Sequence, residues 1–441
     1  MSVSKTKEEP EPHNLLDKLS EALNNSADAN NKVKINEYKS PSYYLPSIGY
    51  VSSLLGLPST QKQLMDLVET TYITPLEISR SSKYDLFNKG VGPKTVSKLI
   101  DWFKKLPLPI EQLANQKLMN EVLHCQKAGS NAGNWFAAIQ NFEAGFMNTS
   151  NATVHEFEPL LDFIERRCNT EVDVLSDVRQ KIKARVSNLT DLDVSCEVQH
   201  SLWSNSPCLS PHIIENVIQI IRMQTQQKNL TEQQTLTVLE SYCYLSFDFY
   251  LEAISHYEVG CRLYYSKDQS KLEDELGMIT EAINAYATDN KTKTCFDGML
   301  GVLKDVVSEI VGVETGYRKL ASFIEIEENE SMASGESLED KKYNQLKDWR
   351  NGLNLPSSKK LALFLQNLDR YAGTSSGNIT WLMCRITMGM DKLVNDIFEL
   401  SKGDNYNSDD VEVIIKNVLA TMPKYHAMNL RKQLDKRKPP S

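Results

Sequence analysis

The spacing of apolar residues between residues 110 and 325 constrains the fold more than any other feature of the sequence. In several stretches apolar side chains recur three and four positions apart, the spacing that lines one face of an α-helix. The clearest examples are EFEPLLDFIERRC, PHIIENVIQIIRMQTQQ and GMLGVLKDVVSEIVGVETGYRKLASFIEI. Alternating patterns typical of strands are short and few. The sequence therefore predicts a mainly α-helical, multi-domain protein.

Helix starts can be placed at two positions in this region. Thr231 is followed by Glu232 and Gln233, and Ser210 stands before Pro211. Hydroxyl side chains cap helix N-termini, and proline suits the first helical position because its missing amide hydrogen is not needed there. We expect helices to begin directly after Thr231 and Ser210.

The composition is that of an ordinary globular protein. The chain has 441 residues, 41% of them hydrophobic and 24% charged, with a net charge of −9. The sequence has no apolar run of about 18 residues and opens on acids and prolines, so we expect a cytoplasmic protein without membrane contact. Its eight cysteines are scattered and do not form a disulfide framework.

Changes in composition suggest six segments. A polar N-terminal segment at 1–40, partly disordered, precedes a small helical unit at 41–108. A helical middle domain at 109–325 is expected to act as a scaffold for protein partners. An acidic linker at 326–341 leads into a C-terminal helical domain at 342–425, and a basic tail follows at 426–441.

One short stretch, NKGVGPKTVSKLIDWF at 88–103, carries the strongest indication of function. Glycine leaves no side chain between the backbone and a ligand and permits positive φ angles. Pro93 suits a helix start, and the amides and dipole of such a start favour an anion. The residues expected to contact a phosphate are Lys89, Gly90, Val91, Gly92, Lys94, Thr95 and Lys98.

This stretch resembles the helix-hairpin-helix family, with Gly90–Val91–Gly92 as the hairpin. The residues from Pro75 onward are also similar to the C-terminal domain of the bacterial RNA polymerase α subunit, which is built on this hairpin. The resemblance implies sequence-tolerant contact with a double-stranded DNA backbone. Asn88 and Lys89 depart from the family pattern, which usually has an apolar residue and proline there. Contact with a protein, or a purely structural role, are the alternatives.

A second stretch at 338–368 resembles the end of the Cro/repressor-type helix-turn-helix family. Trp349, Gly352, Pro356 and Ser357 match its Trp–x–x–Gly turn and the Pro-Ser start of its next helix. The resemblance implies a recognition helix at 338–349, preceded by two helices formed by 313–326. Its candidate groove-facing residues are Lys341, Lys342, Tyr343, Asn344, Gln345 and Lys347. The alternative is a packing unit with Trp349 in a core.

Two Cys-x-x-x-His pairs form the only candidate metal ligands in the sequence: Cys196, His200, Cys208 and His212. Sulfur and imidazole ligands suit tetrahedral zinc. The usual paired grouping of these ligands is absent, and prolines at 207 and 211 interrupt the second pair. An ordinary loop with unrelated polar residues is the alternative, and we expect no other cofactor.

Motifs of common enzymes are missing. The chain has no phosphate-binding loop, no G-x-G-x-x-G after a strand, no G-x-S-x-G and no H-E-x-x-H. No serine or cysteine is nominated as a nucleophile with a neighbouring base. The sequence therefore names no catalytic residue.

The expected function is that of a non-catalytic, DNA-contacting accessory or scaffold protein, with a small N-terminal helix-hairpin-helix unit. The resemblances point to a bacterial or phage-related DNA-handling complex. A helical protein-interaction scaffold without nucleic acid is one alternative, and a metal-dependent nuclease-type enzyme is the other.

Overall fold

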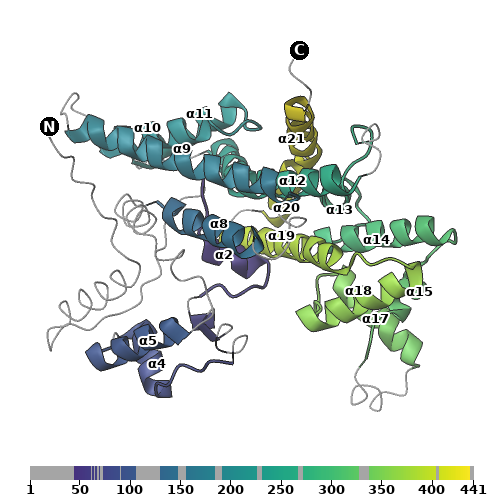
Figure 1. Ribbon diagram of the computed structural model, residues 1–441. Helices are drawn as coiled ribbons and strands as arrows, with labels where there is room; N and C mark the ends of the chain where they lie inside the picture. The colour runs from purple at the N-terminus through teal and green to yellow at the C-terminus, as the bar shows by residue number, and fades with distance from the viewer. Residues whose placement is uncertain are drawn as a thin grey trace, which may run out of the picture. The chain divides into compact units, whose positions relative to one another are not determined.

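The computed structural model describes residues 44–60, 62–63, 65–66, 69, 73–89, 91–105, 130–147, 155–183, 191–225, 231–266, 272–326, 337–403 and 407–437. Helices dominate this part of the chain, and it contains no β-strand element, which confirms the predicted mainly α-helical class (Figure 1). None of the described helices combines the length and the apolar character needed to cross a bilayer.

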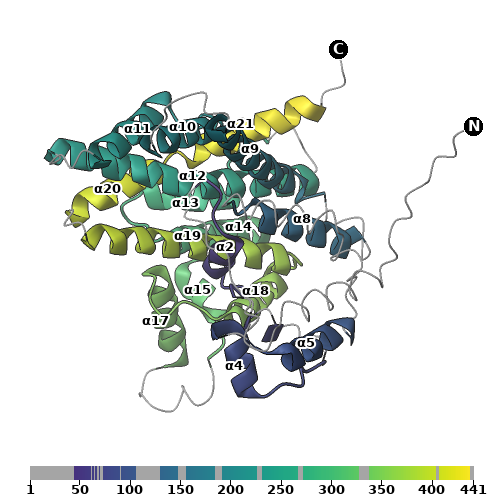
Figure 2. The same cartoon turned by 90° about the vertical axis from the view of Figure 1, so that its left-hand side faces the viewer.

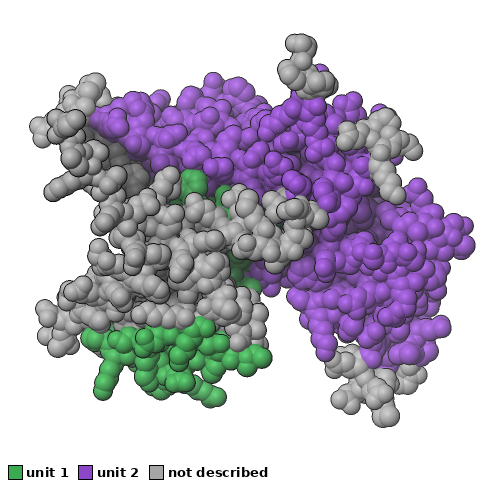
Figure 3. Space-filling model, viewed as in Figure 1, with its two compact units in different colours: residues 1–42, 46–53, 58–150 green, residues 43–45, 54–57, 151–441 purple. Residues whose placement is uncertain are grey.

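The chain divides into two compact units, each discontinuous in sequence (Figure 3). Unit 1 comprises residues 1–42, 46–53 and 58–150, and unit 2 comprises residues 43–45, 54–57 and 151–441. The expected hairpin unit at 41–108 therefore belongs to a larger piece that extends to residue 150. The expected middle domain is divided at residue 150, and its part from residue 151 onward forms one unit with the expected C-terminal domain.

Unit 1 contains short helices: α2 (Ile48–Leu54, whose last residue belongs to unit 2), α4 (Arg80–Asn88), α5 (Pro93–Lys105) and α8 (Ala132–Met147). The indole Nε1 of Trp135 on α8 donates to the Pro46 carbonyl at 2.8 Å and ties this helix to the segment before α2. Trp135 is buried together with Ala132 and Ile139.

Unit 2 is organised around α12 (Glu232–Tyr265), which is buried along most of its length. Thr231 caps this helix in a capping box with Gln234, which confirms the start expected at this threonine. Its neighbours are α9 (Glu158–Lys183), α11 (Pro211–Thr225), α20 (Ser408–Leu419) and α21 (Met422–Arg437), while α10 (Asp191–Trp203) packs on α9 and α11 (Figure 2). The start of α11 at Pro211 also agrees with the sequence.

Further helices continue unit 2 beyond α12. α13 (Met278–Thr288) packs closely on α14 (Cys295–Val311), and α19 (Gly377–Gly403) contacts both. α15 (Tyr317–Ser322), α17 (Leu338–Arg350) and α18 (Ser358–Ala372) complete the unit. The close approach of α13 and α14 depends on Gly298, since a Cβ there would lie 2.3 Å from the carbonyl oxygen of Ala282.

Buried carboxylates hold the starts of these two helices. Asp391 on α19 accepts from the backbone amides of Cys295 at 2.6 Å and Phe296 at 3.0 Å, at the first turn of α14. Glu258 on α12 accepts from the backbone amide of Thr280 at 3.1 Å, in the first turn of α13. Burial raises the pKa of Asp391 to about 7, although these amides oppose the shift.

The basic stretch at 426–441, expected to be a tail, is helical as far as Arg437. Residues up to Arg437 belong to α21, and its Asn429 and Leu430 are buried against unit 2. Apolar side chains at Met422, Tyr425 and Leu430 give this helix a buried face despite its many lysines and arginines. The expected linker is also shorter, because α17 begins at Leu338. The polar segment at 1–40 lies outside the described residues.

Candidate functional site

The hairpin at 80–105 forms as two helices joined by a short turn. Ser79 caps α4 by accepting from the amide of Ser82 at 3.0 Å, and α5 begins at Pro93 as its sequence predicts. Leu86 of α4, Val91 of the turn and Trp102 of α5 are buried. The indole of Trp102 donates to the Thr74 carbonyl at 2.7 Å, which fixes α5 against the preceding loop.

The turn itself leaves Gly92 open. A Cβ at this position would meet no atom within 4 Å, and the backbone of Gly92 does not adopt a positive φ. Gly92 therefore does not use the positive φ that glycine permits, and open access to the backbone is what its position provides. The Gly92 carbonyl accepts from the amide of Thr95 at 3.0 Å. Gly90 lies outside the described residues.

The three lysines of the hairpin have different surroundings. Lys89 lies 3.6 Å from Asp85 in an exposed pair, and Lys98 donates to the Glu77 carbonyl at 3.1 Å. Lys94 is exposed, and no hydrogen bond or ion pair joins it to another described residue. Lys94 is also the one of the three that lies in the first turn of α5, next to the helix N-terminus.

The second stretch forms the expected helix, α17, with Ser337 as its cap. Leu346 and Trp349 on this helix are fully buried, and the Trp349 ring packs edge-on against Phe364 of α18 at 5.6 Å between centroids. Gly352 adopts a φ of 72°, and Ser357 caps α18. These turn and cap positions are the ones that the sequence indicates, and Trp349 belongs to a core.

The lead-in to α17 differs from a helix-turn-helix. The segment 313–326 supplies one helix of six residues, α15, in place of the two expected: Gly312 ends α14, and α15 begins after Gly316 and ends at Ser322. α17 packs against α15 and α14. Lys342 donates to the Ser322 carbonyl at 2.9 Å, and the Arg318 guanidinium covers the Tyr343 ring at 4.6 Å. Asn344 and Lys347 are exposed, whereas Lys341 and Gln345 are half-buried.

The two Cys/His pairs do not converge. Within the described residues no three His, Cys, Asp or Glu side chains are grouped so that they could hold a metal ion. Cys196 is buried in α10, whereas His200 on the same helix is exposed. The Cys208 thiol lies 3.8 Å from the Met428 sulfur, and His212 contacts Asn216 at 3.4 Å.

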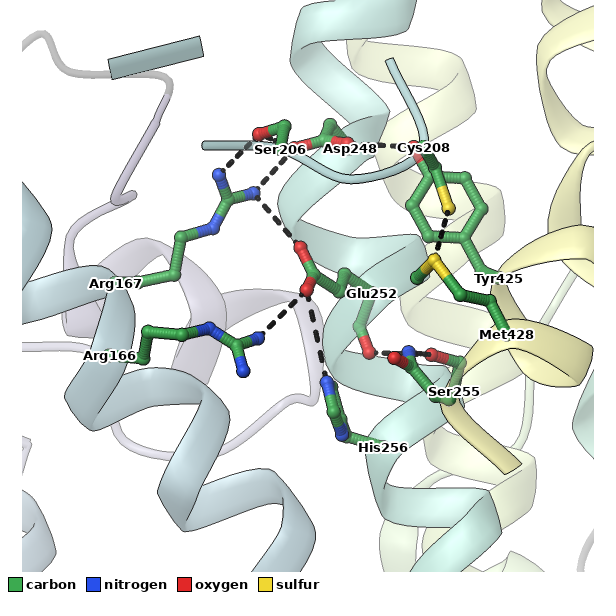
Figure 4. Close-up of polar contacts among 11 residues, drawn as sticks. Arg166, Arg167, Ser206, Cys208, Asp248, Glu252, Ser255, His256, Tyr425 and Met428 are labelled. Carbon is green, nitrogen blue, oxygen red and sulfur yellow. Dashed lines mark hydrogen bonds and ion pairs between the residues drawn. The ribbon is translucent and has the colours of Figure 1, made fainter. Parts of the chain in front are cut away.

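A buried charge network in unit 2 was not foreseen from the sequence (Figure 4). Arg167 on α9 donates to Asp248 on α12 at 2.5 Å and to the hydroxyl of Ser206 at 2.8 Å. Tyr425 on α21 donates to the other carboxylate oxygen of Asp248 at 2.7 Å. The Tyr44 ring lies 4.1 Å from the Arg167 guanidinium. This network joins α9, α12, α21, the turn between α10 and α11, and the segment at 43–45.

One turn further along α12, Glu252 continues the network. It accepts from Arg166 at 3.0 Å and lies 3.8 Å from His256 on the same helix. Burial opposes its charge, but His256 and Arg167 outweigh burial and hold the pKa of Glu252 below its ordinary value. Burial also lowers the pKa of His256 and outweighs Glu252, so the imidazole is neutral beside an ionised carboxylate.

The burial of this network decides what it can do. Arg167, Asp248, Glu252 and His256 are each at most 3% exposed, so solvent and substrate have no direct access to them. The arrangement holds α9, α12 and α21 together through buried hydrogen bonds and ion pairs. Asp248, Glu252 and His256 are four residues apart and therefore lie on one face of α12, and this spacing was the pattern that would have indicated the network.

Comparison of the chain with protein-family models, with curated proteins and with solved structures gave no match.

Proposed function

We propose that this protein is a non-catalytic, DNA-contacting accessory protein that binds the duplex backbone through the α4–α5 hairpin. The observation that carries the proposal is the division of the hairpin into two sides. Val91 is buried beneath the turn, whereas Gly92 and Lys94 are exposed at the start of α5. Unit 2, with its clamped helices, serves as the scaffold within a bacterial or phage-related DNA-handling complex.

The physical basis of the contact is the start of α5. A helix N-terminus presents amide hydrogens and the positive end of the helix dipole, and both favour a phosphate. Gly92 adds no side chain that would keep a phosphate away from this backbone. Lys94 supplies a positive charge one residue beyond Pro93. Contacts of this kind read the backbone and not the bases, so binding is tolerant of DNA sequence.

The charge of the chain limits this binding to a local surface. A net charge of −9 repels DNA at long range. The attraction of the hairpin for phosphates acts only at short range, because salt screens more distant charges. Each phosphate that the hairpin neutralises releases a counterion, so the affinity is expected to fall as salt rises.

The test is fluorescence anisotropy with a labelled duplex of about 20 base pairs at about 50 to about 200 mM salt. Lys94→Glu is expected to weaken binding by about tenfold or more and to reduce the salt slope by about one. Lys98→Glu is expected to have a smaller effect, because Lys98 is engaged by the Glu77 carbonyl.

The matched control is Lys105→Glu at the other end of α5. It makes the same charge change about 16 Å along the helix axis from Lys94, at about 1.5 Å per residue. Equal losses for Lys94→Glu and Lys105→Glu would show that only net charge matters. Absence of salt-dependent binding by folded wild-type protein would contradict the proposal.

A further inference from the structure

A second surface, on unit 2, combines exposed cations with aromatic rings. Among the described residues, six cation–aromatic pairs fall between Lys304 and Tyr371. The aromatic members of these pairs are Tyr317, Phe323, Tyr343 and Tyr371.

α15 places its two outward cations over rings of two different helices. The Arg318 guanidinium lies 4.6 Å from the Tyr343 ring of α17, and the Lys319 amine lies 4.3 Å from the Tyr371 ring of α18. Arg318 is 69% exposed, and both rings are half-buried. Figure 2 shows α15 beside α17, in agreement with their packing.

The position of α15 is fixed from beneath. Arg350 stacks on the Tyr317 ring at 3.8 Å and also donates to the buried carboxylate of Asp297 on α14 at 2.5 Å. Lys342 of α17 donates to the Ser322 carbonyl at the end of α15. Arg318 and Lys319 therefore project from a short helix that is held at both ends, so the surface is largely formed before any ligand arrives.

We propose that this face of α15, α17 and α18 binds single-stranded nucleic acid, with a base stacked on the Arg318 guanidinium over Tyr343 and a phosphate paired with Lys319 beside Tyr371. Guanidinium planes and aromatic faces accept any unpaired base, and the adjacent charges attract phosphates. In a duplex the base faces are already stacked inside, so this surface selects single strands. The proposal is independent of the α4–α5 hairpin, which belongs to unit 1.

Acids also belong to this face: among the described residues, Glu325 follows α15, and Glu339 and Asp340 lie in the first turn of α17. Asp340 pairs with Arg318 at 3.3 Å, and both side chains are more than half exposed. An exposed pair of this kind is weak because water competes for both charges, so a phosphate can displace the carboxylate. The Glu325 carboxylate accepts a hydrogen bond from the side-chain amide of Asn367 at 3.1 Å.

The test uses labelled oligothymidylate and oligouridylate of about 20 nucleotides, and an abasic strand of the same length. The affinities are measured in a Lys94→Glu background, so that the hairpin does not contribute. Both base-containing strands are expected to bind, with the abasic strand about tenfold weaker or worse. Equal affinity for the abasic strand, or no binding of any strand by the folded protein, would overturn the proposal.

The matched variants are Arg318→Ala/Lys319→Ala and Lys291→Ala/Lys293→Ala. Both remove two positive charges, but Lys291 and Lys293 lie in the exposed loop before α14. The first pair is expected to lose about tenfold in affinity for oligothymidylate, and the second pair less than about threefold. Equal losses from the two pairs would refute stacking at α15.

Photocross-linking of the wild-type protein locates the bases without any change of sequence. An oligonucleotide carrying 5-iodouracil is expected to cross-link to peptides that contain Tyr343 or Tyr371. Cross-links found only elsewhere would contradict this surface even if single strands bind.

Discussion

Arg167 and Asp248 form an ion pair that is closed to solvent, with 3% and 0% of the two side chains exposed. A pair of this kind gives specificity to the packing of α9 on α12, because each charge requires the other in the absence of water. Its contribution to stability depends on both partners being present.

We expect Arg167→Met alone to lower the free energy of unfolding by about 3 to 5 kcal/mol, because Asp248 is left as an unpaired buried charge. The double variant Arg167→Met/Asp248→Leu is expected to recover part of that loss. Urea unfolding followed by circular dichroism measures both changes. A double variant whose loss of stability equals the summed losses of the single variants Arg167→Met and Asp248→Leu would show that the pair is not a coupled unit.

Asp391 predicts an unusual pH dependence of stability. Its pKa is raised to about 7 in the folded state and returns to its ordinary low value on unfolding. Between about pH 4 and pH 7 the folded protein holds a proton that the unfolded chain has lost. The contribution of Asp391 to the free energy of unfolding therefore falls as pH rises. Asp391→Asn imitates the protonated form and removes this trend.

The measurement for Asp391 is the free energy of unfolding of wild type and Asp391→Asn at several pH values. Each pH unit within the window changes the difference by at most about 1.4 kcal/mol. The stability advantage of wild type over the variant is expected to be larger at low pH than above pH 7. Parallel curves for the two proteins would show that Asp391 titrates normally.

His426 predicts the opposite trend in an overlapping range. Arg262 can only donate, so the His426 Nε2 atom accepts at 3.1 Å and the ring must be neutral. Burial and Arg262 lower the pKa of His426 to about 4, below its unfolded value. The neutral ring therefore contributes its full share to the free energy of unfolding at neutral pH, and this contribution is lost as pH falls from about 6.5 towards 4.

We expect His426→Gln to reduce the acid sensitivity of the melting temperature between about pH 6.5 and pH 4.5, since glutamine can accept from Arg262 without titrating. Thermal melts in matched buffers test this. His212→Gln, at an exposed histidine on α11, serves as the control and should leave the pH profile unchanged. An unchanged profile for His426→Gln would contradict the assignment.

Two glycines on α14 predict opposite effects of the same substitution. At Gly298 a Cβ would lie 2.3 Å from the Ala282 carbonyl oxygen, whereas at Gly301 the nearest atom is the Tyr317 hydroxyl at 3.5 Å. Gly298→Ala is expected to destabilise the protein by about 1 to 3 kcal/mol, because α13 must move away. Gly301→Ala is expected to stabilise it by up to about 1 kcal/mol through helix propensity. Chemical denaturation of both variants provides the comparison, and equal effects would contradict the close approach of α13 and α14.

Local signals in the sequence predicted several elements well. The cap at Thr231, the start at Pro211, the Pro93 start and the turn at Gly352 all depend on residues within a few positions of each other. The helical class follows from the apolar spacing along single helices. These features need no knowledge of distant contacts.

The buried network could not be predicted in the same way. Arg167 meets a serine 39 positions away, and Asp248 meets a tyrosine 177 positions away. The polar stripe on α12 indicates that partners exist, but it does not say which residues they are. The basic residues of α21 led to the expectation of a tail for a related reason. The few apolar residues of this helix form a buried face only because other helices of unit 2 pack against it.

The docking of Tyr44 also bears on how the protein can be divided. Tyr44 packs edge-on against Trp203 at 5.4 Å and covers Arg167, so part of the core of unit 2 is encoded about 100 residues before its main sequence. No single cut separates the two units. A fragment that starts at residue 151 contains every helix from α9 to α21 and still lacks a piece of its own interior. Any dissection of this protein must therefore keep residues 43–45 and 54–57 with unit 2, either by fusion or as a separate peptide.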